Sequence, residues 1–199
     1  MHRSSYLKMQ YFKDNYLNPD DELKILDIGS FDRDGNYNYG LILNEDKWTY
    51  HGLDLNEGNN VDIVVEDPYD WKEIPDESYD VIVSGQAFEH IEFFWLTLDQ
   101  IKRILKPEGL LCIIVPSSGE VHRNPYDCYR FQEDGMKAMA KYIDFQVLET
   151  GTRSDDVNQW NDSHLIAKKS DSVSLDDLEN KIDTLENKLD LIMAKLNIK

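Results

Sequence analysis

The chain contains the stretch Lys24-Ile25-Leu26-Asp27-Ile28-Gly29-Ser30-Phe31-Asp32-Arg33-Asp34-Gly35, a short apolar run followed by a loop rich in Asp and Gly. The apolar run predicts a buried parallel strand that ends at Gly29. Gly29 lets the backbone approach a ligand closely, and the Asp27 carboxylate can accept hydrogen bonds from a ligand amine or hydroxyl. The stretch therefore predicts a strand followed by a loop that holds a small molecule.

A second apolar run, over residues 50–55, predicts the next strand and carries Asp54 near its end. Asp54 follows Gly29 by 25 positions, close to the ~20-residue offset at which an acid binds a ribose in nucleotide-binding βαβ units. The dinucleotide fingerprint GxGxxG is absent, because Phe31 stands where a second close-packed glycine would be. The two strands predict a nucleotide-like ligand site, and the alternative is an ordinary turn between a strand and a helix.

The composition is that of a folded and strongly acidic chain. Of its 199 residues 41% are hydrophobic, which supports one packed domain, assigned to residues 1–169, and an appendage at 170–199. The net charge of −18 argues against a nucleic-acid substrate, since phosphate binding needs clustered Lys and Arg. Cys112 lies in an apolar run and Cys128 in a polar loop, so no disulfide framework is expected. With no signal peptide or membrane span evident, we expect a cytoplasmic protein.

The order of the predicted elements indicates an α/β fold. Apolar and aromatic residues recur at helical spacing within residues 1–18, which predicts a helix that packs on the domain or, alternatively, closes over the ligand as a lid. Further helices are predicted at 36–43, 91–105 and 132–142. Strands are predicted at 24–28, 49–53, 61–65, within 76–84, and at 110–115, 145–149 and 164–168. Strands that alternate with helices predict a doubly wound sheet.

The last thirty residues carry a separate pattern. Leu and Ile recur at alternating gaps of three and four, at Leu175, Leu178, Ile182, Leu185, Leu189, Ile192 and Leu196. These are the a and d positions of a coiled coil, so residues 170–199 predict a helix that joins copies of the chain into a homo-oligomer. The alternative is an amphipathic helix that folds back on its own domain.

The glycine loop at 29–35 resembles motif I of the class I S-adenosylmethionine (SAM) methyltransferases, hydrophobic-Leu-Asp-hydrophobic-Gly-x-Gly, with Phe31 in place of the second glycine. The stretches Asp76-Glu-Ser-Tyr-Asp80 and Leu105-Lys-Pro-Glu-Gly109 resemble further signatures of the same family. The resemblance implies a Rossmann-like, seven-stranded sheet whose last strand is antiparallel, with SAM as the cofactor. The residues it assigns to cofactor binding are Asp27, Gly29, Ser30, Phe31, Gly35, Asp54, Leu55, Asp67, Pro68 and Gly85.

Residues 116–131 form a connection far longer than the ~2 to 6 residues usual in an α/β unit, and such loops are often functional. SAM carries an activated methyl group, so the enzyme must align the acceptor and remove the proton of an alcohol. We expect His122 of this loop to be the general base, oriented by Asp127, with His90 as the competitor for that role. Polar groups for a substrate are expected from Glu89, His90, Arg123, Tyr126 and Arg130.

Two alternatives remain for this loop. In the first, an Arg-Asp pair braces the loop internally, and His122 only makes hydrogen bonds within that brace and has no catalytic role. A divalent metal such as Mg²⁺ can also activate a hydroxyl, but the sequence shows no compact cluster of His and Asp ligands, so no metal is expected.

The stretches 27–35, 84–95 and 116–131 together resemble a methyltransferase subgroup found with glycosyltransferases in surface-glycan synthesis. The resemblance implies O-methylation of a sugar hydroxyl on a sugar or glycan acceptor. The alternatives are an N-methyltransferase of small molecules or amines, and a non-catalytic SAM-fold subunit that scaffolds a glycosyltransferase partner.

Overall fold

The computed structural model describes residues 3–33, 35, 38–153, 161–170, 183, 185 and 188. Along the chain these form α1 (Arg3–Tyr16), β1 (Lys24–Ile28), η1 (Tyr39–Leu41), β2 (Thr49–Asp54), β3 (Ile63–Val64), β4 (Tyr79–Gly85), η2 (Phe88–His90), α2 (Phe94–Ile104), β5 (Leu105–Pro116), α3 (Glu133–Tyr142), β6 (Phe145–Arg153) and β7 (Asp162–Lys169). The coiled coil predicted for residues 170–199 lies almost entirely outside the described residues and stays a prediction.

The strands form one seven-stranded sheet in the order β3-β2-β1-β4-β5-β7-β6. The first five strands along the chain pair in parallel. β7 lies antiparallel between β5 and β6. The predicted Rossmann-like sheet with an antiparallel last strand is confirmed. Because β1 to β5 run in parallel, their carboxyl ends meet at one edge, where ligands of such sheets bind.

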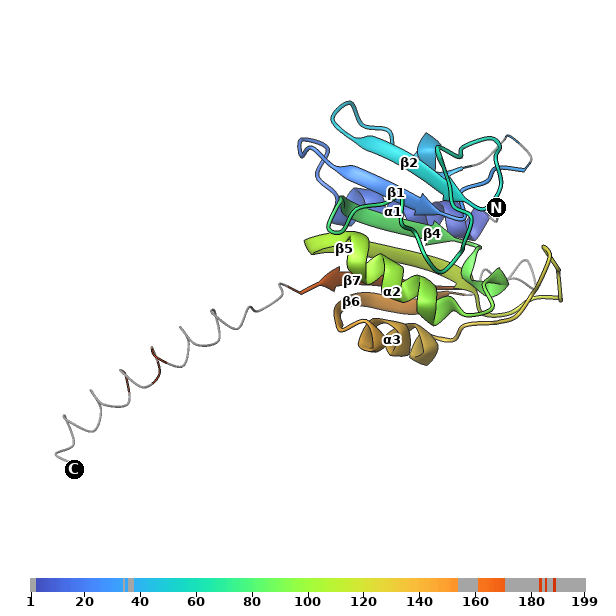
Figure 1. The fold of residues 1–199 in the computed structure, drawn as a ribbon. Helices are drawn as coiled ribbons and strands as arrows, with labels where there is room; N and C mark the ends of the chain where they lie inside the picture. Colours follow the sequence, from blue (N-terminus) through green and yellow to red (C-terminus); the bar gives the residue numbers. More distant parts are fainter. Residues whose placement is uncertain are drawn as a thin grey trace.

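Helices cover both faces of the sheet (Figure 1). Alternate side chains of a strand point to opposite faces, so Leu26 joins the core under α2 and α3, while Ile25 joins the core under α1. Met9 and Phe12 of α1 are fully buried in that second core. The structure therefore shows the helix packed on the domain that the sequence predicted, and the lid role stays a prediction.

Two predicted elements are shorter than expected. Over 36–43 the described residues form only the single turn η1, because the Asn38 side chain accepts a hydrogen bond from the Leu41 amide and starts the turn late. The strand predicted at 61–65 contains only Ile63–Val64. Before Ile63, at the amino end of the predicted strand, Asp62 lies outside β3, and its carboxylate accepts the Gly52 amide at 2.8 Å.

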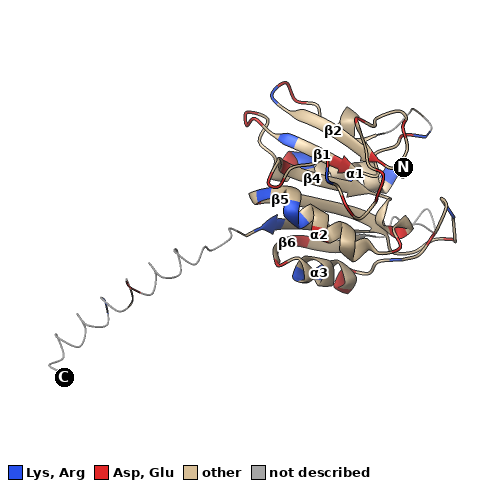
Figure 2. Ribbon diagram, in the orientation of Figure 1, with Lys and Arg blue, Asp and Glu red and all other residues tan. Residues whose placement is uncertain are grey.

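The charged residues are interspersed over the described elements (Figure 2). Lysines at the edge opposite the carboxyl ends of β1 to β5 are matched with acids, since Lys106 pairs with Asp80 at 2.7 Å and Lys168 pairs with Glu108. Within the described part of the chain, every helix is too short or too polar to cross a bilayer.

Candidate active site

The loop after β1 is tied to β2 by its backbone. The amides of Gly29 and Ser30 both donate to the carbonyl of Leu53, at 2.9 and 3.1 Å. Gly29 has φ +74°, and a Cβ there would lie 2.4 Å from the Cβ of Ala87, so neither the backbone nor the space admits a side chain. The predicted need for glycine at this position therefore has a steric cause.

Asp54 ends β2 directly beside this loop. Its carboxylate is half-buried and lies near the Phe31 amide (3.4 Å) and the Asn56 amide (3.1 Å), which hold it at the sheet edge. The ring of Phe31 packs on Gly58, where a Cβ would come within 2.2 Å of it. The Phe31 side chain therefore packs against the segment after β2. This packing explains how the loop accommodates a large residue where the methyltransferase motif has glycine. The carboxylate and the loop backbone fit the ribose side of a nucleoside cofactor.

Asp27 takes part in a hydrogen-bond network inside the protein. It is buried and accepts a hydrogen bond from the Tyr50 hydroxyl at 2.5 Å, and Asn60 in turn donates to that hydroxyl at 2.9 Å. Burial raises the pKa of Asp27 to about 7, although the bond from Tyr50 opposes this shift. Asn60 also donates to the carbonyl of Ser30, so the network fixes the shape of the glycine loop.

The sequence did not predict the parts of Tyr50 and Asn60 in this network. Asn60 has φ +64°, a conformation typical of Asn and Gly in turns. The run Gly58-Asn59-Asn60 was the available signal of such a turn.

The remaining predicted cofactor residues lie along the same edge but do not all meet. Gly35 donates its amide to the buried carboxylate of Asp32, at 2.9 Å. Gly85 ends β4, and the hydroxyl of Tyr39 fills the space of its missing Cβ. Leu55 is half-exposed beyond β2. Asp67 is exposed beyond β3, where its carboxylate accepts the Tyr69 amide in a local turn. The carbonyl of Pro68 accepts a hydrogen bond from the hydroxyl of Thr97 on α2, at 3.5 Å.

The loop 116–131 is anchored to η2, the turn that follows β4. The amides of Cys128 and Tyr129 both reach the carbonyl of Glu89, at 2.7 and 3.3 Å. The carbonyl of Tyr126 lies 2.6 Å from Nδ1 of His90. These bonds bring two segments that are far apart in the sequence into one site.

Arg130 and Asp127 form the internal brace that was the alternative reading of this loop. The guanidinium donates to both carboxylate oxygens of Asp127, at 2.5 and 2.8 Å, and to the carbonyl of Glu120 at 2.8 Å. Arg130 holds the pKa of Asp127 well below its usual range. Asp127 also accepts the backbone amide of His122 at 2.7 Å, while its distance to the imidazole Nδ1 is 3.6 Å. Asp127 therefore orients the loop more directly than it orients the ring.

Arg123 and Tyr126 keep exposed side chains on this loop, as a substrate-binding role requires. Arg130 is instead committed to the brace.

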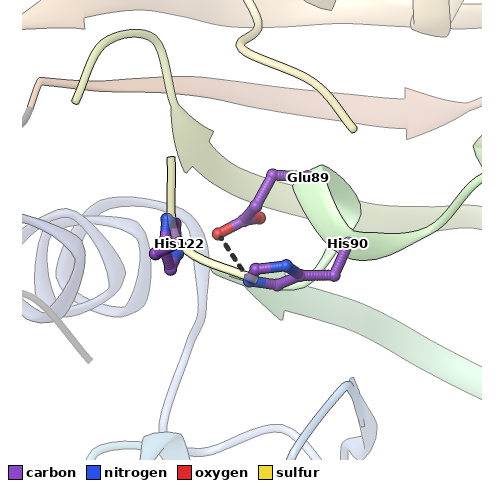
Figure 3. Close-up of side chains that lie close together, drawn as sticks. All are labelled: Glu89, His90 and His122. Atoms are coloured by element: carbon purple, nitrogen blue, oxygen red, sulfur yellow. Dashed lines mark ion pairs between the residues drawn. The ribbon is translucent and has the colours of Figure 1, made fainter. Parts of the chain in front are cut away.

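Glu89, His90 and His122 converge beside the brace (Figure 3). The two imidazole rings pack edge to face with centroids 4.9 Å apart, and Oε1 of Glu89 lies 3.6 Å from Nε2 of His90. Glu89 is fully buried, and neither of its carboxylate oxygens has a hydrogen bond. Burial raises the pKa of Glu89 to about 8 and lowers the pKa of His90. The sequence shows no compact cluster of ligands because these three residues come from two separate loops, which only the fold brings together.

A cavity of about 350 Å³ lies elsewhere, between α1 and the strands β5 to β7. Its polar lining is internally paired, since His164 contacts both Lys8 (3.3 Å) and Glu149 (3.1 Å). Glu149 also accepts a hydrogen bond from Tyr16 at 2.8 Å, and burial is the main cause that raises the pKa of Tyr16 to about 12. This network fastens α1 to the sheet and is not part of the candidate site.

Comparison with protein families identifies one match. Residues 37–113 match the family described as a methyltransferase domain. The match runs from before η1 into β5 and so contains Asp54, Asp67, Gly85 and Glu89, but not the loop 116–131. No curated protein matches the sequence significantly.

Solved structures with the same fold cover most of the chain. The 1,6-didemethyltoxoflavin-N1-methyltransferase of Burkholderia thailandensis, with 1,6-didemethyltoxoflavin and S-adenosylhomocysteine bound, has 15% identity and a TM-score of 0.64, covering 85% of this chain and 78% of that one. A SAM-dependent methyltransferase of Methanosarcina mazei has 16% identity and a TM-score of 0.60, covering 79% and 96%. The [4+2]-cyclase SpnF has 13% identity and a TM-score of 0.65, covering 82% and 80%.

At identities this low, the structural likeness shows the fold alone. The cyclase SpnF illustrates that one fold serves different reactions. The chain thus has the fold of the SAM-dependent methyltransferases among these structures, and its residues 37–113 match a methyltransferase domain.

Proposed function

We propose that this chain is a SAM-dependent O-methyltransferase whose acceptor is a hydroxyl group of a sugar or glycan. The observation that carries the proposal is the meeting of Glu89, His90 and His122 at the sheet edge that also bears Asp54. An imidazole at this position suits removal of a hydroxyl proton, because its pKa lies near neutral pH in water.

SAM supplies an activated methyl group whose bond to sulfur breaks as the bond to the acceptor oxygen forms, leaving S-adenosylhomocysteine. Asp54 would hold the ribose hydroxyls, and the backbone of the Gly29 loop would approach the methionine end. On the acceptor side, the exposed Arg123 and Tyr126 offer donors and a stacking face for a sugar ring. His122 is the proposed base and accepts the proton that the hydroxyl loses.

Two other functions have some support. The Burkholderia thailandensis structure is that of an N-methyltransferase, and an amine acceptor would need no base with a pKa near neutrality. A scaffold for a glycosyltransferase would use the predicted coiled coil and no catalysis. The sugar acceptor rests on the likeness of the three stretches 27–35, 84–95 and 116–131 to the glycan subgroup.

The test is release of S-adenosylhomocysteine by the purified full chain, with SAM and a panel of deoxyhexose glycans as acceptors. Acceptor-dependent release and an O-methyl signal in the product spectrum are expected. An N-methyl product would favour the amine function, and no release with any acceptor would favour the scaffold.

Asp54→Ala tests the cofactor side separately. Loss of charge-assisted hydrogen bonds worth ~1.5 to 3 kcal/mol should weaken SAM binding about tenfold to a hundredfold in calorimetry. Asp99→Ala is the matched control, because Asp99 is an exposed acid on α2 whose carboxylate accepts only a surface bond from Tyr142. Equal SAM affinity in both folded variants would contradict the role of Asp54.

A further inference from the structure

The cluster of Glu89, His90 and His122 has the donor groups of a metal site. Each residue offers one ligand atom, and these atoms all lie within 4.8 Å of one another. In Figure 3 the carboxylate of Glu89 points between the two imidazole rings. Two imidazoles and a carboxylate are a donor set that zinc and other divalent transition metals bind, whereas Mg²⁺ prefers oxygen ligands.

We propose that Glu89, His90 and His122 bind one divalent transition-metal ion of the zinc type per chain. The inference rests on the proposed function, since the ion would lie where the acceptor hydroxyl is expected. It specifies how that hydroxyl is bound and activated.

The geometry around His90 fits a metal ligand. The 2.6 Å contact between its Nδ1 and the carbonyl of Tyr126 keeps the ring proton on Nδ1 and leaves Nε2 with a lone pair. Metal-binding histidines are usually held by such a bond on the second nitrogen. Nε2 lies 3.6 Å from Oε1 of Glu89, close to the ~3.4 Å that separates two ligands of a tetrahedral ion with bonds of ~2.1 Å.

Glu89 provides the second and independent observation. A carboxyl group that is fully buried without a hydrogen bond is costly, because it loses its hydration and gains no hydrogen bond in return. The side chain is aimed into the cluster, so a bound cation would satisfy the two oxygens that the protein leaves without a hydrogen bond.

The nearby charges also permit a cation. Arg130 lies close, with Nη2 at 3.4 Å from Nδ1 of His122, but its charge is matched by the bidentate pair with Asp127. With that pair neutral, the nearby charges leave room for a cation, which would bind Glu89 in exchange for the proton of its carboxyl group. Asp127 Oδ2 lies 3.6 Å from Nδ1 of His122, so a carboxylate of the kind that supports a metal-bound histidine is close to this ring.

Three protein ligands leave at least one position on a zinc-type ion open. A hydroxyl bound there would lose its proton more easily, as water does on zinc. The proton would pass to solvent water, the oxygen would take the methyl group, and sulfur would keep the electron pair of the broken bond. His122 would then act as a ligand, in place of its proposed role as a base.

The experiment is calorimetric titration of the chelator-treated full chain with Zn²⁺. One ion per chain is expected. Glu89→Gln, His90→Ala and His122→Ala should each weaken binding at least tenfold. His51→Gln is the matched control, because His51 contacts Tyr79 and lies outside the cluster. Its affinity for Zn²⁺ should equal that of the wild type.

Failure to bind Zn²⁺, or binding that none of the three substitutions weakens, would overturn the inference. Glu89→Gln keeps the volume of a buried side chain, and the half-exposed His122 lies on a loop, so folding losses cannot explain both variants. SAM affinity, measured on the same samples, separates the two proposals. Intact SAM binding and glycan methylation without Zn²⁺ binding would contradict the metal site alone. Zn²⁺ binding without methylation of any acceptor would contradict the proposed O-methyltransferase function.

Discussion

Asp27 makes the stability of the fold depend on pH. The folded chain holds the pKa of this buried carboxyl at about 7, whereas an unfolded Asp ionises near ~3.9. Between these two values the folded state keeps one more proton than the unfolded state, so the free energy of unfolding falls as pH rises through this window and levels off above it.

Asp27→Asn should remove this dependence. The variant keeps an acceptor for the Tyr50 hydroxyl but no titrating group. Relative to the variant, the wild type should lose on the order of 4 kcal/mol of unfolding free energy between about pH 4 and 7. Urea unfolding of both SAM-free proteins at a series of pH values measures the difference. The comparison cancels the parallel contribution of Glu89, whose pKa is also raised. A constant difference across the range would contradict the prediction.

Individual site residues were predictable where chemistry and chain position coincide. Asp54 and Gly29 follow apolar runs, so the parallel strands had to bring them to one edge. The roles of Tyr50 and Asn60 were not predictable, because a hydroxyl in a strand and an amide in a turn carry no signal of a shared partner.

At the scale of elements, α1 shows how helical spacing predicted burial. Met9 and Phe12 recur on one face of the helix and are fully buried against the sheet. The spacing alone left two readings open, a packed helix and a lid, because it does not say which surface the apolar face covers.

Phe12→Ala distinguishes those readings. Removing a fully buried ring should lower the free energy of unfolding by about 3 to 5 kcal/mol, since the cavity can close only in part. Leu7→Ala, on the same helix but half-exposed, should change it by less than about 0.5 kcal/mol. Denaturant unfolding checks both. Unchanged stability in Phe12→Ala with weakened SAM binding would instead support a lid.

The strands were predicted well because buried parallel strands are continuous apolar runs. Loops were predicted poorly, for a physical reason seen at Glu89, His90 and His122. Their meeting depends on bonds from the amides of Cys128 and Tyr129 to the carbonyl of Glu89, and backbone bonds between loops leave no residue pattern. The predicted partnership of His122 with Asp127 was local in sequence and was found, though mainly through the backbone.

At the scale of the whole molecule, the described residues form two hydrophobic cores, one on each face of the sheet. One core lies between the sheet and the helices α2 and α3, the other between the sheet and α1, and both are made of residues before 170. If the Leu and Ile repeat of 171–199 forms the predicted helix, its apolar seam needs a surface to bury it.

We expect that removal of residues 171–199 lowers the oligomeric state and leaves the domain folded. Light scattering of the full and shortened chains measures the mass, and urea unfolding checks the domain. Within the full chain, Ile182→Asp with Leu189→Asp places charges at two a positions and should dissociate the oligomer, because a buried charge without a partner is costly. Asn180→Asp with Asn187→Asp adds the same charge at the outward f positions and should leave the mass unchanged. A full chain that is already monomeric at micromolar concentration would mean that the repeat packs on its own domain instead, and in that case the shortened chain should lose stability.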